Sequence, residues 1–455
     1  MKQRNIIFLH ARVWIALINF TFSIGAFGQT AFEDYYLRST NYPSFGNLWT
    51  LNGLEDGEAQ GVTHDDNNWL FTWTFSNTGY MFKVPVDIPI NNNVLQNPNV
   101  SIVNMSQFSD LTGYWHWGDP DHYKYAGIEY IVVPITGGGT PIIAIFRSSN
   151  LGLVAYGELN NQQSTGWCAI HPKTGILYTS EDFDYAPPVP DCDDQSQHFL
   201  YARKLLRYEI PWQSLPLSGY IGKISLISKD AVEMLSEAGS QIELYNMQGG
   251  EFTPSGEILY ISSGSGCCFG KGHGQQYFID GLRTFDTQTW KEIKRSKNHN
   301  CDSCPSNLNE YFDYYYPLGC NGAGAWSPEG LTIWDLDNGI SPNVRGKLHV
   351  LLFKFHKTGD NRQVFEHFSN QIYFNEGSGI DQSLPLSDIV VIVGDDALPG
   401  TYSKPFKTFA YGMNYLPVWN GAHLILEKGN YSVPAPYTIN RRLLITSQGG
   451  AATIK

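Results

Sequence analysis

The chain alternates short runs of apolar and aromatic residues with glycine-rich turns from about residue 45 to residue 380. In five places a glycine-containing segment leads into a short strand, a tight turn and a second strand. Two of these places share one spacing, HPKTGILY from His171 to Tyr178 and TPSGEILY from Thr253 to Tyr260. The five segments begin at Gln60, His116, Gly166, Gln248 and Gly324. The pattern therefore predicts a repeated antiparallel β-unit.

Repeats of roughly 50–80 residues that each hold three or four strands are typical of propeller blades. A single sheet of this kind cannot bury both of its faces, whereas sheets packed around an axis cover one another. We therefore predict an all-β, five-bladed β-propeller over residues 40–380. Six blades are the alternative, because residues 96–115 and 218–247 have room for further strands.

The C-terminal residues 385–455 follow a different pattern. Apolar strand-like runs, among them Asp388 to Gly394 and His423 to Tyr431, flank an amphipathic segment with the sequence Pro-Phe-Lys-Thr from Pro405. These features resemble the N-terminal cap and first rungs of a right-handed parallel β-helix of the pectin-lyase-like class. The resemblance implies a small β-rich segment at the start of such a helix. Because a β-helix needs about three repeats for stability, we expect this segment to be truncated, docked on the propeller or completed by another chain.

Residues 1–28 have the pattern of a secretory signal peptide. Lys2, Arg4 and Arg12 accompany an apolar run from Val13 to Phe27, which ends among small residues. The run of about 15 residues is shorter than the roughly 20 that span a bilayer. We therefore expect a cleaved leader, a secreted, periplasmic or cell-surface location, and no transmembrane segment in the mature chain. An uncleaved membrane anchor is the alternative.

All seven cysteines are disulfide candidates, because disulfides persist in the oxidising environment that an exported protein meets. They are Cys168, Cys192, Cys267, Cys268, Cys301, Cys304 and Cys320. A bridge from Cys168 to Cys192 would close a proline-containing loop, and the odd count leaves at least one thiol free or paired between chains. The spacing of Cys301, Cys304 and Cys320 also fits a zinc knuckle, so that alternative stays open.

Composition narrows the class of protein further. Of the 455 residues, 42% are hydrophobic, 14% are aromatic and only 16% are charged. This apolar and charge-poor content argues against an intrinsically disordered chain and against a coiled coil. The formal net charge is -13 and there is no basic stripe, so we do not expect nucleic acid as a partner.

Polar residues of the innermost strands are expected to face the propeller channel. The segment from Tyr114 to Tyr123 holds two histidines and two aspartates. Strand alternation puts His116 and Asp119 on opposite faces unless Gly118 or Pro120 bends the chain. The candidate metal ligands of the channel are His64, His116, Asp119, His122, His171 and Glu251.

Imidazole and carboxylate together suit zinc, manganese or iron better than calcium, which prefers oxygen ligands alone. A divalent metal in the channel is the one cofactor that these residues suggest, and none is certain. The alternative is that the same groups hydrogen-bond across the channel or to the loops of the blades.

Four aromatic residues near this segment suggest a rim on which sugars stack, because an apolar sugar face packs against an aromatic ring. These candidate ligand-binding residues are Trp115, Trp117, Tyr123 and Trp167. Packing of the same rings inside the blades is the alternative.

Two short segments resemble secreted β-propellers of the broad calcium-dependent lactonase, strictosidine-synthase and NHL type. They are Glu58 to Asp65, which follows the pattern Glu-x-x-Gly-Val-x-x-Asp, and Glu329 to Thr332, with the sequence EGLT. The resemblance extends over about 330 residues and implies a propeller scaffold with lactonase or lyase chemistry.

Three functions follow from these observations. The first is a secreted binding protein whose propeller face binds carbohydrate or another extracellular ligand, such as a protein. The alternative is a metal-dependent propeller hydrolase or lyase that acts on a sugar or a lactone. The third is an interaction or structural protein whose C-terminal segment joins a larger β-helix.

Overall fold

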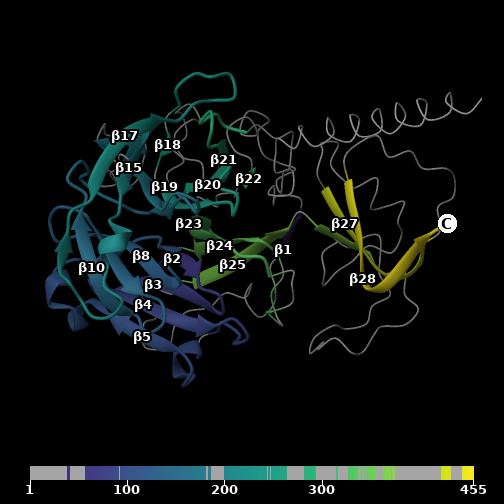
Figure 1. Ribbon diagram of the computed structural model, residues 1–455, viewed down its shortest axis with the longest axis horizontal. Coiled ribbons are helices and arrows are strands. Elements are labelled where there is room, and N and C mark those ends of the chain that lie inside the picture. The colour runs from purple at the N-terminus through teal and green to yellow at the C-terminus, as the bar shows by residue number, and fades with distance from the viewer. Residues whose placement is uncertain are drawn as a thin grey trace, which may run out of the picture.

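The chain folds as an all-β protein built around a β-propeller, as predicted (Figure 1). The computed structural model describes residues 38–40, 57–91, 93–180, 183–185, 199–242, 244–245, 247–263, 281–293, 314–315, 326–336, 340–341, 344, 346–354, 362–369, 371–374, 422–431 and 443–455. Regular structure in these residues is β-strand, apart from single 3-10 turns. The turns are η2 (Val94–Gln96), η3 (Met105–Gln107), η4 (Ser109–Leu111) and η5 (Trp212–Ser214).

The first two sheets follow one another along the chain. The first is antiparallel and consists, in order, of β2 (Glu58–His64), β3 (Asn68–Phe75), β4 (Thr78–Pro85) and β5 (Ser101–Asn104). In the second sheet two short inner strands both pair with β8, and a distant short strand adds in parallel to the outer edge. Its members are β6 (His116–Trp117), β7 (Asp121–Tyr125), β8 (Ile128–Thr136), β9 (Ile142–Arg147), β10 (Gly152–Glu158) and β16 (Lys223–Ile224).

Three further sheets are four-stranded and antiparallel. One consists of β11 (Ala169–Ile170), β12 (Ile176–Ser180), β15 (Lys204–Glu209) and β17 (Ile227–Glu233). The next consists of β19 (Met247–Phe252), β20 (Ile258–Ser263), β21 (Gly281–Asp286) and β22 (Tyr314–Tyr315). The last consists of β23 (Trp326–Ile333), β24 (Leu348–Lys354), β25 (Arg362–Ser369) and, at its outer edge, β1 (Arg38–Thr40).

Two three-stranded sheets lie outside this series. The smaller one joins β13 (Phe183–Tyr185), β14 (Phe199–Ala202) and β18 (Leu244–Tyr245). The other is parallel and joins β26 (Gln371–Phe374), β27 (Ala422–Tyr431) and β28 (Leu443–Ile454), to one side of the propeller in Figure 1. β26 falls inside the range predicted for the propeller but pairs with the C-terminal strands. The predicted domain boundaries, the number of blades and the likeness to a β-helix stay predictions.

The middle strands of the blades are buried on both faces. β20 is buried at every position, and β3 is buried from Trp69 to Trp73. Apolar residues therefore run on continuously along such strands, which leaves little place for charge. Trp69 of the first sheet packs edge-on against Trp334, which follows β23 of the last sheet, with ring centres 4.8 Å apart. Within the first sheet, Phe71 stacks on Phe82 at 5.6 Å.

Innermost strands approach one another so closely that glycine is required. β2, β19 and β23 each contain a β-bulge at a glycine, namely Gly61, Gly249 and Gly330. A Cβ atom on Gly330 would lie 2.2 Å from Asp119 Oδ1 and 2.6 Å from Gly61 Cα. The glycines of the repeated sequence pattern therefore mark the centre of the propeller.

Several predictions fall on residues that the structure does not describe. They include the signal peptide over residues 1–28 and six of the cysteines: Cys192, Cys267, Cys268, Cys301, Cys304 and Cys320. Among the described residues, no helix is long and apolar enough to cross a membrane.

Gly330→Ala is expected to lower the free energy of unfolding by about 1–3 kcal/mol, because the added methyl group has no space at the propeller centre. Urea unfolding of the purified protein measures this change. Gly152→Ala is the matched control, since its Cβ would meet only the flexible Asn150 side chain, at 3.0 Å, and its effect should stay within about 0.5 kcal/mol. Equal stability of Gly330→Ala and the wild type would show that the strands can move apart.

Candidate functional site

The inner edge of the second sheet is interrupted at Asp119, between β6 and β7. The backbone of Asp119 forms its hydrogen bonds with residues 166–168, which lead into the next sheet, and not with β8. The Asp119 N–H donates to the Gly166 carbonyl at 2.8 Å, and the Asp119 carbonyl accepts from the Cys168 N–H at 3.2 Å. Pro120 follows and has no N–H to donate. The chain thus bends between Gly118 and Pro120, which is the bend that strand alternation required.

The Asp119 side chain connects three other sheets. Oδ1 accepts a hydrogen bond from the Val62 amide at 2.9 Å, and Oδ2 accepts from the amides of Gly250 at 3.3 Å and Leu331 at 3.4 Å. The residue is completely buried. Burial holds the pKa of Asp119 well above its ordinary value, while the three amide hydrogen bonds act in the opposite direction. Asp119 was a candidate metal ligand, but its oxygens here serve backbone amides.

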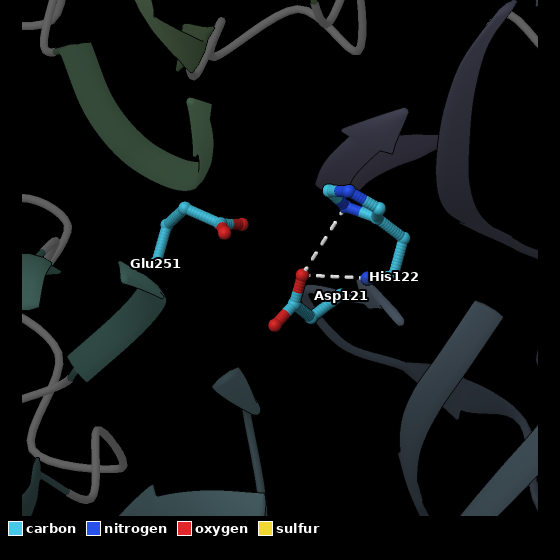
Figure 2. A group of neighbouring side chains, drawn as sticks. All are labelled: Asp121, His122 and Glu251. Atoms are coloured by element: carbon cyan, nitrogen blue, oxygen red, sulfur yellow. Dashed lines mark hydrogen bonds and ion pairs between the residues drawn. The ribbon is translucent and has the colours of Figure 1, made fainter. Parts of the chain in front are cut away.

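Just beyond this point, Asp121, His122 and Glu251 converge (Figure 2). One potential ligand atom from each residue lies within 4.8 Å of the other two. Asp121 and Glu251 are only 1% and 5% exposed, whereas the His122 side chain is 25% exposed. The group is therefore a buried pair of carboxyls that is reached from the side of the imidazole.

Asp121 and His122 are held in place by neighbouring strands. Asp121 Oδ2 accepts a hydrogen bond from the Ile170 amide of β11, and Oδ1 accepts one from the His122 amide at 2.5 Å. His122 Nδ1 lies 3.5 Å from Asp121 Oδ1 and 3.2 Å from the Thr63 hydroxyl of β2. Three sheets thus fix the orientation of these two side chains.

Glu251 belongs to β19, and one of its carboxyl oxygens lacks a hydrogen-bond partner among the described residues. This atom, Oε2, is buried. Burial raises the pKa of Glu251 well above its ordinary value, and the charge of Asp121, a hydrogen bond with Asp121 and the charge of Asp119 raise it further. A hydrogen bond with the Thr332 side chain lowers this pKa.

No lysine or arginine is among the main influences on the pKa of Glu251 or of Asp119. A buried carboxylate is costly unless it is paired, protonated or bound to a metal. Two carboxylates and one imidazole form a ligand set that suits zinc, manganese or iron. The arrangement is therefore able to hold a divalent cation with three protein ligands.

The structure brings together two of the predicted metal ligands, His122 and Glu251. The third member, Asp121, was not predicted as a ligand, although it lies in the segment with two histidines and two aspartates. Neighbouring residues of a regular strand face opposite sides, but here His122 Nδ1 lies 3.5 Å from Asp121 Oδ1, directly after Pro120. The sequence signal for this arrangement was the Asp-Pro-Asp-His run itself.

The remaining predicted ligands lie apart from the group or have other contacts. The His64 ring lies 4.1 Å from that of His122, but its two nitrogens face the carbonyls of Asp65 and Ile333 at 3.1 Å. His116 lies in β6, with Nδ1 3.4 Å from the Thr136 hydroxyl. His171 follows β11 and packs edge-on against Phe252.

The predicted sugar-stacking residues divide into two pairs. Trp117 and Trp167 are completely buried, and their indole N–H groups donate to the Tyr114 carbonyl and the Ser180 hydroxyl. Core packing, the alternative for these rings, therefore describes both tryptophans. Tyr123 packs on Trp212 and Trp115 on His116, and both are partly exposed. Sugar stacking on Trp115 and Tyr123 stays a prediction.

Cys168 is buried and has no disulfide partner among the described residues, and its sulfur lies 3.5 Å from the Val132 carbonyl oxygen. Burial raises the pKa of this thiol well above its ordinary value. The suggested bridge to Cys192 stays a prediction, since Cys192 is outside the described residues.

Comparison of the sequence with protein-family models and with curated proteins gives no match. Among solved structures, the fold resembles glycoside hydrolase β-propellers. The catalytic domain of an α-L-arabinofuranosidase of glycoside hydrolase family 62 from Coprinopsis cinerea is 11% identical, with a TM-score of 0.38 over 74% of this chain and 97% of that chain. An α-L-arabinofuranosidase from Podospora anserina, in complex with cellotriose, is 10% identical, with a TM-score of 0.38 over 72% and 99%. An α-L-arabinanase from Cellvibrio cellulosa, complexed with arabinohexaose, is 12% identical, with a TM-score of 0.34 over 69% and 90%. Similarity at this level carries no conclusion about activity.

In metal-free protein, the raised pKa of Glu251 makes the native state bind a proton more tightly than the unfolded chain, whose glutamate titrates near 4.5. The stability contributed by this proton is present below that pH and is lost as the pH rises through the native pKa. Glu251→Gln stays neutral, so with a chelator present it should match the wild type at pH 4 and melt at a higher temperature at pH 8.

Thermal unfolding at both pH values measures this difference. Glu257→Gln, on the partly exposed turn after β19, removes one negative charge as well and should show no such dependence. A Glu251→Gln variant that is less stable than the wild type at pH 8 would contradict the burial of an unpaired carboxyl.

Proposed function

We propose that this chain is a secreted β-propeller enzyme, a hydrolase or lyase, which uses a divalent metal ion in its channel to act on a sugar or a lactone. The observation that carries the proposal is the convergence of Asp121, His122 and Glu251. In this group Glu251 Oε2 is buried and has no hydrogen-bond partner among the described residues. The class of substrate follows the lactonase and strictosidine-synthase resemblance of Glu58 to Asp65 and Glu329 to Thr332.

Direct acid–base catalysis by the two carboxyls fits the geometry less well than a metal. Carboxyl pairs that flank a glycosidic bond stand about 5–5.5 Å apart in retaining enzymes and about 6.5–9.5 Å apart in inverting ones. One ligand oxygen of Asp121 and one of Glu251 lie within 4.8 Å of each other. This separation is shorter than either of those ranges, whereas it suits two ligands of one cation.

Each residue has a distinct task in the proposed centre. Asp121, fixed by the Ile170 amide, and Glu251 supply oxygen ligands, and His122 supplies a nitrogen ligand. Three protein ligands leave a coordination position open, as in catalytic zinc sites. A metal bound there would polarise a substrate oxygen and lower the pKa of a bound water. Substrate would approach from the partly exposed side of His122.

The ligand set favours a transition metal over calcium. Calcium takes six to eight oxygen ligands, and this group offers one imidazole and two carboxyls in a buried position. The proposal thus differs from the calcium dependence that the family resemblance implies.

A second function is favoured by the depth of the group. With Asp121 1% and Glu251 5% exposed, a cation there could instead join the second and fourth sheets of a secreted protein that binds carbohydrate or protein on its propeller face. Enzymatic turnover separates this function from the first.

We also propose that the propeller has five blades and that the C-terminal parallel sheet is the start of a β-helix. Five blades are supported by β1, which adds to the outer edge of the sheet of β23, β24 and β25. They are also supported by the strands in the two regions considered for a sixth blade. β5, β16 and β17 each extend one of the five larger sheets, whereas β18, also in the second region, pairs with β14 in a separate sheet. The parallel pairing of β26, β27 and β28 supports the start of a β-helix.

The purified protein is expected to bind one Zn²⁺ per chain, as measured by isothermal calorimetry after chelation. Asp121→Asn and His122→Ala should each weaken this binding by about 100-fold or more, because each removes a direct ligand. His171→Ala is the matched control and should leave the dissociation constant unchanged.

Turnover of a panel of aryl glycosides and lactones should disappear on chelation and return with Zn²⁺ or Mn²⁺. Metal binding without turnover of any substrate would favour the binding protein. A wild-type chain that binds no divalent ion would rule out both forms of the centre.

A further inference from the structure

Two side-chain contacts join the first and second sheets beside the candidate centre. In the first, Thr63 Oγ1 of β2 and His122 Nδ1 of β7 lie 3.2 Å apart. In the second, Lys124 Nζ lies 2.7 Å from Asp66 Oδ2, in the turn between β2 and β3. His122 and Lys124 are two residues apart on β7, so they share a face of the strand. The Lys124–Asp66 pair therefore stands next to His122, between the same two sheets.

Solvent exposure rises along this line of contacts. Asp121 is 1% exposed and the His122 side chain 25%. The side chains of Lys124 and Asp66 are 51% and 65% exposed. Glu129 is the cross-strand partner of Lys124 on β8 and places a second carboxylate 3.8 Å from the Lys124 ammonium. The exposed side of His122 is therefore bordered by three charged side chains.

The charges of these three side chains favour a neutral ligand that is rich in hydroxyl groups. A carboxylate only accepts hydrogen bonds and an ammonium only donates them, whereas a hydroxyl group does both. Adjacent hydroxyls of a sugar can therefore donate to Asp66 and accept from Lys124. A lactone without hydroxyl groups offers acceptors alone, so it has no donor for the two carboxylates.

The same charges disfavour an anionic sugar. Asp66 and Glu129 bring two negative charges against the single positive charge of Lys124, and the whole chain has a formal net charge of -13. A negative field at the approach to a site lowers the local concentration of anions. The ligand that fits best is therefore a sugar without a carboxylate.

We propose that Asp66, Lys124 and Glu129 form the subsite that binds a neutral sugar beside the channel metal. Asp66 and Lys124 hold adjacent hydroxyl groups of the sugar, and Glu129 holds the Lys124 ammonium in position. This inference rests on the proposed function and narrows its substrate from a sugar or a lactone to a neutral carbohydrate.

The test measures ligand binding by calorimetry on the full chain loaded with Zn²⁺. The probes are neutral phenyl thioglycosides, the matching phenyl thiouronides and a hydroxyl-free lactam, which resist hydrolysis. The variants are Asp66→Ala and Lys124→Met.

Lys223→Met and Glu158→Ala are the matched controls. These two residues form an ion pair of similar kind, with side chains 50% and 30% exposed. The pair joins β16 to β10 at the outer edge of the second sheet, away from β7.

The wild type should bind a neutral thioglycoside at least about tenfold more tightly than the matching thiouronide or the lactam. Asp66→Ala and Lys124→Met should each weaken this binding about tenfold, the loss expected for a hydrogen bond to a charged group. Both variants should keep the wild-type Zn²⁺ affinity and melting temperature, because exposed ion pairs contribute little to stability and neither residue is a ligand. Lys223→Met and Glu158→Ala should match the wild type in all three measurements.

A wild type that takes up Zn²⁺ but binds no neutral thioglycoside, or that prefers the thiouronide or the lactam, would overturn this inference and leave the proposed centre intact. Unchanged sugar binding in Asp66→Ala or in Lys124→Met would also overturn it, because the sugar would then lie elsewhere. Failure of the wild type to bind any divalent ion would overturn the proposed function, and this inference with it.

Discussion

The propeller depends on one buried carboxylate at its centre, that of Asp119. It accepts hydrogen bonds from the amides of Val62, Gly250 and Leu331, which belong to three different sheets. Backbone bonds from the same residue extend to Gly166 and to the segment that leads into a further sheet. Buried amides need an acceptor and a buried carboxylate needs donors, so each group satisfies the other. Convergence on a single side chain also explains the glycines at the closest points of the inner strands.

The same convergence creates the candidate centre. Strands that meet at Asp119 place their next side chains around the same axis, and these include Glu251, which lies close to Asp121 and His122. Asp119 has both of its oxygens occupied by amides, whereas Glu251 Oε2 has no partner among the described residues. Glu251 thus differs from Asp119 and also from Asp121, whose two oxygens accept from the amides of His122 and Ile170, in having an oxygen without an amide donor among the described residues.

The sequence predicted the propeller because its signals are local. Alternating apolar runs, glycine-closed turns and the shared spacing of HPKTGILY and TPSGEILY act within about ten residues of one another. Glu251 was predicted as a channel ligand from its place in the repeat, and His122 from the local cluster of histidines and aspartates between Tyr114 and Tyr123. Trp117 and Trp167 were open to two interpretations, since an aromatic residue beside a channel looks the same in sequence whether it faces the channel or the core. Their complete burial places them in the core.

The sequence by itself determined the class of fold, the position of the inner strands and the residue types that line the channel. Only the tertiary structure decided which of those residues act together. The reason is the distance along the chain between partners: Asp119 and the Gly250 amide are 131 residues apart, and Asp121 and the Ile170 amide are 49 apart. Such pairings decide which carboxyl oxygens accept hydrogen bonds from distant amides, and no local pattern encodes them.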